Sequence, residues 1–133
     1  MLKTTIGEVY HCKVDCRFHC IYMIRDEDVI MYVGQSVDIQ KRLQAHIGFD
    51  RVGEVICYSL PQSLGWTMEL YSLNDCDALL NDCYLDVDSA EFDIIVHFKP
   101  CLNELYNRDK PILPERYYDS KKIVNAGIRQ SEW

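Results

Sequence analysis

The chain has 133 residues and a formal net charge of −7 at pH 7, from 14 Lys and Arg against 21 Asp and Glu. Hydrophobic residues make up 48% and charged residues 26%, which excludes disorder, collagen and coiled coil as descriptions of the whole chain. No run approaches the roughly 18 apolar residues of a membrane span, and the charged N-terminus is unlike a signal peptide. We predict a single domain over residues 1–133. We also predict a reducing cytoplasmic location, which would be the host cytoplasm for a phage or viral protein.

Potential zinc ligands crowd one N-terminal stretch: His11, Cys12, Cys16, His19 and Cys20. From residue 10 to residue 24, however, apolar and polar side chains alternate, which predicts a strand with one wet face. Cysteines four apart on a strand lie about 13 Å from each other, too far for one tetrahedral zinc site. The seven cysteines are odd in number, so we predict free thiols that serve as small core residues.

The next elements follow from hydrophobic period and turn signals. A polar turn at 25–28 leads into a β-rich run at 29–33, and the two strands predict a hairpin. Apolar residues four apart then predict a helix over 37–47, with Ser36 as its N-cap and Gly48 after its end.

The second half of the chain is less regular. Residues 54–60 look like a third strand, 66–80 like a helix with loose boundaries, and 86–98 like a better helix. Asp86 or Asp88 would cap this last helix, and Pro100 would end it. The fold class is therefore α+β: a small three-stranded antiparallel sheet flanked by helices, with an extra N-terminal strand segment and an irregular tail over 104–133.

Charge is spread unevenly along the chain. Residues 52–107 carry ten acidic side chains and one basic one, whereas 108–133 are basic and include Lys121 and Lys122. A protein that grips DNA by broad phosphate neutralisation would be basic overall, so any polyanion must meet a local patch or a metal ion. We predict that the tail follows a nucleic-acid backbone, with Tyr117 and Tyr118 for stacking. The alternative is an ordinary tail that packs Tyr117 or Trp133 on the core.

An ordered set of residues then carries a family resemblance: Cys20-Ile21-Tyr22, Tyr32-Val33-Gly34, Arg42, His46, Glu91 and Asn103. With this spacing the chain, from about residue 20 to 103, resembles the GIY-YIG nuclease superfamily, whose core order is β-β-α-β-α. Two positions depart from the pattern. Cys20 stands at the first glycine of the name motif, and Gln35 stands where some relatives have a lysine.

The resemblance implies hydrolysis of a DNA phosphodiester with one Mg²⁺ or Mn²⁺ per site. A carboxylate such as Glu91 suits Mg²⁺ as a ligand, and Arg42 suits a phosphate as a bidentate partner. Either tyrosine is a candidate general base; we favour Tyr22 on the water and Tyr32 on the phosphate.

The remaining candidates have supporting roles. His46, one helical turn from Arg42, is expected to orient the water or a phosphate oxygen. Asn103 would orient Tyr22 or close the hairpin against the last helix. Three further residues follow the second tyrosine and are expected near the substrate: Gly34, Gln35 and Ser36.

Each residue also has an ordinary structural interpretation. The tyrosines suit strand packing, Arg42 and His46 suit a solvated helix face, and Glu91 suits a capping box with Asp88. The alternative function is a non-catalytic interaction protein on the same scaffold, whose acidic 52–107 region binds a basic partner.

The sequence leaves several properties of the predicted nuclease open. RNA remains an alternative substrate, and the setting could be restriction, a mobile element or a phage. A homodimer is expected if both DNA strands are cut, because one such site cuts one strand.

Overall fold

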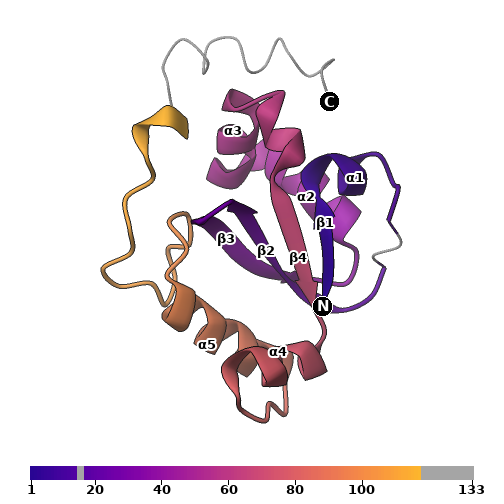
Figure 1. Ribbon diagram of the computed structural model, residues 1–133, viewed down its shortest axis with the longest axis vertical. Helices are drawn as coiled ribbons and strands as arrows, with labels where there is room; N and C mark the ends of the chain where they lie inside the picture. The colour runs from indigo at the N-terminus through magenta and orange to yellow at the C-terminus, as the bar shows by residue number, and fades with distance from the viewer. Residues whose placement is uncertain (15–16, 118–133) are drawn as a thin grey trace.

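A computed structural model describes residues 1–14 and 17–117. A four-stranded antiparallel sheet, in the order β1-β4-β2-β3, lies between two groups of helices (Figure 1). The strands are β1 (Leu2–Thr5), β2 (Cys20–Asp26), β3 (Val29–Ser36) and β4 (Thr67–Tyr71). The helices are α1 (Ile6–Tyr10), α2 (Ile39–Phe49), α3 (Arg51–Tyr58), α4 (Leu73–Leu80) and α5 (Val87–Phe98), with 3₁₀ turns η1 (Gln62–Gly65) and η2 (Glu115–Tyr117). The α+β class and the flanked antiparallel sheet are confirmed.

Strand β2 is central because it pairs with both β3 and β4. Its alternate side chains enter two cores: Tyr22 and Ile24 pack toward α1, α2 and α3, whereas Ile21 and Met23 pack toward α4 and α5. The predicted strand over 10–24 is wrong in its first half, because α1 ends at Tyr10 and β2 begins only at Cys20. Alternation alone did not make residues 11–14 a strand, since they have no neighbouring strand to pair with.

The predicted strand at 54–60 is a helix, α3. Asp50 caps it by accepting a hydrogen bond from the backbone N–H of Gly53 at 3.1 Å. Val52, Val55 and Ile56 are buried at a helical spacing, so tertiary packing overrides the β propensity of this run.

The predicted helix at 66–80 is instead β4 followed by α4. Ser72 and Asp75 form a capping box that starts α4 immediately after the strand. The third strand of the hairpin sheet is therefore β4, which also pairs with β1.

Helices α2 and α5 are present as expected, with corrected ends. Asp38 rather than Ser36 caps α2, and the hydroxyl of Ser36 accepts a hydrogen bond from the Asp38 N–H at 3.0 Å. Helix α2 also runs through Gly48 to Phe49. Asp86 caps α5, so Glu91 lies beyond the first turn and belongs to no capping box.

The six described cysteines are free, and the first two of them differ in burial. Cys20 is buried as predicted, but Cys12 is exposed in a turn, and Cys16 lies outside the described residues. Within 1–14 and 17–117, no group of three or more His, Cys, Asp or Glu could hold a metal ion. No helix of this part is long and apolar enough to cross a bilayer.

The described start of the tail packs on the core. The Tyr117 ring contacts Trp66 edge to face at 5.4 Å, and its hydroxyl donates to Asp26 Oδ2 at 2.6 Å. Tyr117 is therefore not available for stacking on a base. Four other tail residues with predicted roles lie outside the described residues: Tyr118, Lys121, Lys122 and Trp133.

Candidate active site

The β2–β3 hairpin places two tyrosine rings around a glycine. Tyr22 pairs with Gly34 across the hairpin, and Tyr32 lies two residues before that glycine. A Cβ added at Gly34 would lie 2.5 Å from the hydroxyl oxygen of Tyr22 and 2.9 Å from Cε2 of Tyr32. Gly34 thus allows both rings to lie close to the β3 backbone, with centroids 6.0 Å apart.

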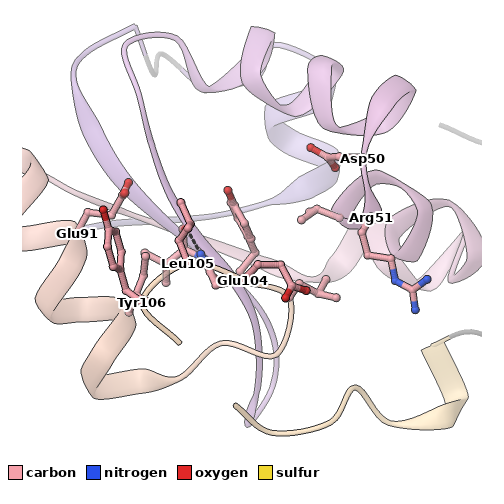
Figure 2. A pocket seen from close by; sticks show the side chains of 12 residues that line it. Asp50, Arg51, Glu91, Glu104, Leu105 and Tyr106 are labelled. Carbon is pink, nitrogen blue, oxygen red and sulfur yellow. Dashed lines mark hydrogen bonds between the residues drawn. The ribbon is translucent and has the colours of Figure 1, made fainter. Parts of the chain in front are cut away.

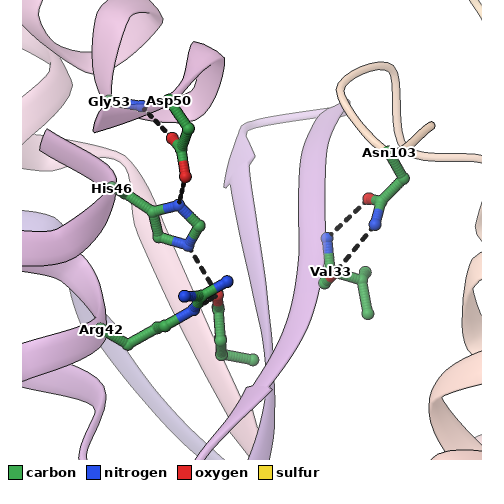
Figure 3. A network of polar contacts seen from close by, with 7 residues as sticks. Val33, Arg42, His46, Asp50, Gly53 and Asn103 are labelled. Atoms are coloured by element: carbon green, nitrogen blue, oxygen red, sulfur yellow. Dashed lines mark hydrogen bonds and ion pairs between the residues drawn. The ribbon is translucent and has the colours of Figure 1, made fainter. Parts of the chain in front are cut away.

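Tyr22 is the first member of a chain of polar contacts. Its hydroxyl lies 2.7 Å from Nε2 of His46, and Nδ1 of His46 lies 2.6 Å from Oδ2 of Asp50. Figure 3 shows His46 between Asp50 and the guanidinium of Arg42. Tyr22 and His46 are 0% and 1% exposed, so this contact is sealed from solvent.

Burial sets the protonation of these groups. It raises the pKa of Tyr22 and of Tyr32, so both phenols are protonated near neutral pH. Burial also lowers the pKa of His46, more than its hydrogen bond to Asp50 raises it, which favours the neutral imidazole. A neutral His46 can therefore accept the hydroxyl proton of Tyr22.

Arg42 lies on the solvent side of the Tyr22–His46–Asp50 contacts. Its Nε donates a long hydrogen bond of 3.4 Å to the Tyr22 hydroxyl, and the contact lowers the pKa of that phenol against the effect of burial. The side chain is on an exposed position of α2, so the guanidinium can also meet a phosphate. Arg42 therefore connects the buried pair to the surface.

A hollow of about 340 Å³ opens beside the tyrosines, between β3, the α2–α3 junction, α5 and the loop that follows α5. Tyr32, Asp50 and Glu91 line it, and Tyr106 stands at its rim with 56% of its surface exposed. In the view of Figure 2, Glu91 and Tyr106 lie on one side of the hollow and Asp50 on the other. Of the two tyrosines, Tyr32 faces this space, whereas Tyr22 stands behind it.

Glu91 is a half-buried carboxylate that fits a hard cation. Burial raises its pKa, Asp88 adds to this effect, and Gln35 and Arg42 oppose it. In the part of the chain that the structure describes, Glu91 has no ion pair with a Lys or Arg side chain. A half-buried carboxylate without a Lys or Arg ion pair suits Mg²⁺, which binds through one or two carboxylates and keeps several waters.

Gln35 follows Gly34 at the end of the Tyr32-Val33-Gly34 motif. Its Oε1 lies 3.0 Å from Nε2 of His19, and its Nε2 donates to Asp88 Oδ1 at 2.6 Å. Gln35, on β3, therefore connects the segment before β2 to the helix that carries Glu91. Its amide holds α5 in place but adds no positive charge.

Asn103 closes the loop after α5 against the hairpin. Its Oδ1 accepts from the Val33 N–H at 2.9 Å and its Nδ2 donates to the Val33 carbonyl at 2.8 Å (Figure 3). Of its two expected roles, the structure places it in the second, since it contacts β3 and not Tyr22. These contacts fix the distance between the strand of Tyr32 and the helix of Glu91.

Two site residues thus differ from expectation. His46 does not face a water or phosphate, because both ring nitrogens have protein partners and the ring is buried. Asp50 was not anticipated at all. Asp50 directly follows α2, four residues after His46, and its position as N-cap of α3 would have been the available signal.

Comparison with known proteins defines the family. Residues 18–77 match the family model described as the GIY-YIG catalytic domain. No curated protein and no solved structure gives a match. Residues 18–77 therefore match a GIY-YIG catalytic domain, and proteins with this domain are in general DNA endonucleases. The match covers Tyr22, Tyr32, Arg42, His46 and Asp50, whereas Glu91 and Asn103 lie beyond it.

Proposed function

We propose that this protein hydrolyses a phosphodiester bond of DNA with a single Mg²⁺ or Mn²⁺ held by Glu91. The observation that carries the proposal is the Tyr22–His46 contact of 2.7 Å next to the only partly buried Arg42, beside a hollow that Glu91 lines. A packing tyrosine does not need a neutral imidazole as its partner, an exposed arginine over its hydroxyl and a half-buried carboxylate nearby.

Arg42 is the phosphate ligand in this scheme. Its bond to the Tyr22 hydroxyl is long at 3.4 Å, so a phosphate oxygen, which carries a full charge, competes well for the guanidinium. When Arg42 turns to the phosphate, it uncovers the hydroxyl that it shields in the free protein. Substrate binding therefore prepares the base.

Tyr22 is the general base. The attacking water gives its proton to the Tyr22 oxygen while the phenolic proton of Tyr22 passes to Nε2 of His46, so no free phenolate has to form in the buried site. This transfer requires His46 to be neutral, in agreement with its lowered pKa. Tyr32, which faces the hollow, holds a phosphate oxygen.

Glu91 would hold the divalent cation in the hollow that it lines. A divalent cation bound there supplies counter-charge for the pentacovalent transition state and for the leaving oxygen. The exposed ring of Tyr106 at the rim of the hollow provides a surface on which a base next to the scissile phosphate stacks.

The test is nicking of supercoiled plasmid with Mg²⁺, Mn²⁺ or EDTA, with Glu91→Ala beside the wild type. Loss of the metal ligand is expected to lower the rate by about three orders of magnitude or more. Glu104→Gln is the matched control, because Glu104 lines the same hollow but is exposed and paired with Lys110. Its rate is expected to stay within about threefold of wild type.

The outcomes separate the alternatives. If wild type leaves both DNA and RNA uncut with either metal, the catalytic proposal is wrong. Cutting of RNA alone would reassign the substrate. The ratio of nicked to linear product then reports whether two sites act together.

A further inference from the structure

Asp50 connects two helices and a histidine through a single carboxylate. It ends α2, where its N–H donates to the carbonyl of His46 at 3.3 Å, and it begins α3. Its two carboxylate oxygens have separate partners: Oδ1 accepts from the N–H of Gly53 at 3.1 Å, and Oδ2 lies 2.6 Å from Nδ1 of His46. The position of Oδ2 is thus fixed by the cap that Oδ1 makes.

This contact determines where the histidine carries its proton. An ionised carboxylate only accepts hydrogen bonds, so Nδ1 at 2.6 Å must be the donor. In a neutral imidazole the other nitrogen then has a free lone pair. That nitrogen, Nε2, is the one 2.7 Å from the Tyr22 hydroxyl, which therefore donates to it.

A helix cap would not require this arrangement. Asp38 and Asp86 cap α2 and α5 with the same residue type and bond backbone N–H groups without meeting a histidine. Only at Asp50 does the second oxygen reach a ring that is 1% exposed and in contact with a candidate general base. The carboxylate also lines the hollow beside Tyr32 and Glu91.

We propose that Asp50 is a positioning residue of the nuclease site, which holds His46 as the Nδ1–H tautomer and stabilises the imidazolium formed when Nε2 takes the proton of Tyr22. This inference rests on the proposed function, in which Tyr22 is the general base. In the step, the bond between water oxygen and hydrogen breaks as its proton moves to Tyr22 and the phenolic proton moves to Nε2. The water oxygen bonds to phosphorus, the bond to the leaving oxygen breaks, and that oxygen takes a proton from solvent. After the product leaves, the imidazolium releases its proton through Tyr22 to solvent.

The charge around His46 is consistent with this role. The ionisable groups that face the ring are Tyr22 on β2, Tyr32 on β3, Arg42 one turn earlier on α2, and Asp50 just after α2. Arg42 opposes a positive charge on the ring and Asp50 favours it. Without the carboxylate, an imidazolium beside a guanidinium in a buried site would be strongly disfavoured.

The decisive variant is Asp50→Asn. Asparagine caps a helix about as well as aspartate, so the cap to Gly53 is retained. Its amide N–H, however, donates toward Nδ1 and leaves the proton on Nε2, so that His46 can no longer accept from Tyr22. By analogy with the same substitution in a serine protease triad, we expect the nicking rate to fall about 10³- to 10⁴-fold.

Two measurements separate this role from a structural one. Nitrogen chemical shifts of ¹⁵N-histidine-labelled protein report the tautomer: wild-type His46 is expected as Nδ1–H and Asp50→Asn as Nε2–H. The matched control is Asp38→Asn, which makes the same change at the N-cap of the helix that carries His46. It is expected to keep the wild-type tautomer and rate, and both variants are expected to melt within a few degrees of wild type.

The outcomes either support or overturn the role of Asp50. A wild-type His46 that is bare at Nδ1 overturns it without any variant, even if Asp50→Asn does not fold. A changed tautomer with an unchanged nicking rate overturns the catalytic role. If wild type does not cut nucleic acid, the proposed function fails, and the catalytic role of Asp50 fails with it. A changed tautomer together with a rate loss that Asp38→Asn does not share supports the proposal.

Discussion

Replacing Gly34 by alanine tests the close packing of the two tyrosines. The added methyl would lie 2.5 Å from the Tyr22 hydroxyl oxygen, 2.7 Å from Cζ of that ring and 2.9 Å from Cε2 of Tyr32. These separations are far below carbon contact distances of about 3.5 Å, so at least one ring must move. Tyr22 is fully buried and cannot turn outward, so the β2–β3 pairing must also adjust.

Overpacking of a core by one methyl typically costs about 1–3 kcal/mol. For a domain of this size that corresponds to a melting temperature lower by about 4–12 °C. The displacement of the proposed general base matters more for activity, because a shift of about 1 Å can cost about 10² in rate. We therefore expect Gly34→Ala to fold at room temperature and to nick plasmid about 100-fold more slowly than wild type.

Gly48→Ala is the matched control. Gly48 lies within α2, its added methyl meets nothing within 4 Å, and its backbone is helical. Alanine there should stabilise the protein by about 0.5–1 kcal/mol and leave the nicking rate unchanged. Thermal melts and plasmid nicking of both variants make the comparison. A Gly34→Ala protein with wild-type melting temperature and rate would refute the packing argument.

Three further predictions concern other residues of the candidate site. Tyr22→Phe removes the proposed base and should lower the nicking rate by about 10²- to 10⁴-fold, whereas Tyr32→Phe should mainly raise KM; equal kcat losses would contradict the separate roles. Arg42→Lys keeps the charge but loses bidentate contact and should cost about 10²-fold in kcat/KM, with a wild-type value counting against a phosphate ligand. Burial lowers the pKa of His46 below its ordinary 6.5, so the unfolded chain binds a proton that the folded chain does not. The free energy of unfolding should therefore fall as pH drops from 6.5 toward that lower pKa, and His46→Asn should flatten this slope in melts between pH 7.5 and 5; an equal slope in both proteins would exclude His46 as its source.

The sequence predicted which of the candidate residues lie close together where that proximity depends on local spacing. Arg42 and His46 lie one turn apart on a helix, and the two tyrosines lie on the two strands of one hairpin. These relations depend on local helix and hairpin geometry and not on tertiary packing, so residue order alone predicts them. The hairpin, the helix that follows it and the helix of Glu91 were recovered for the same reason.

The sequence misplaced the middle of the fold, because short apolar runs do not define their own secondary structure. Residues 54–60 are rich in β-branched and aromatic side chains, yet Asp50 caps a helix there whose buried face packs on the core. The strand that completes the sheet is 67–71, whose partners β1 and β2 lie more than 40 residues away in the chain. Pairing of that range depends on the whole core and leaves little local signal.

Composition, order and spacing thus predicted the α+β class and the hairpin, and the order of the candidate residues carried the family resemblance. Tertiary structure alone decided which groups touch. It sealed Tyr22 and His46 from solvent, left Tyr32 and Glu91 on the hollow, and brought Asp50 against the histidine. The physical reason is that burial and hydrogen-bond partners, which set proton positions and pKa values, arise only when distant elements pack together.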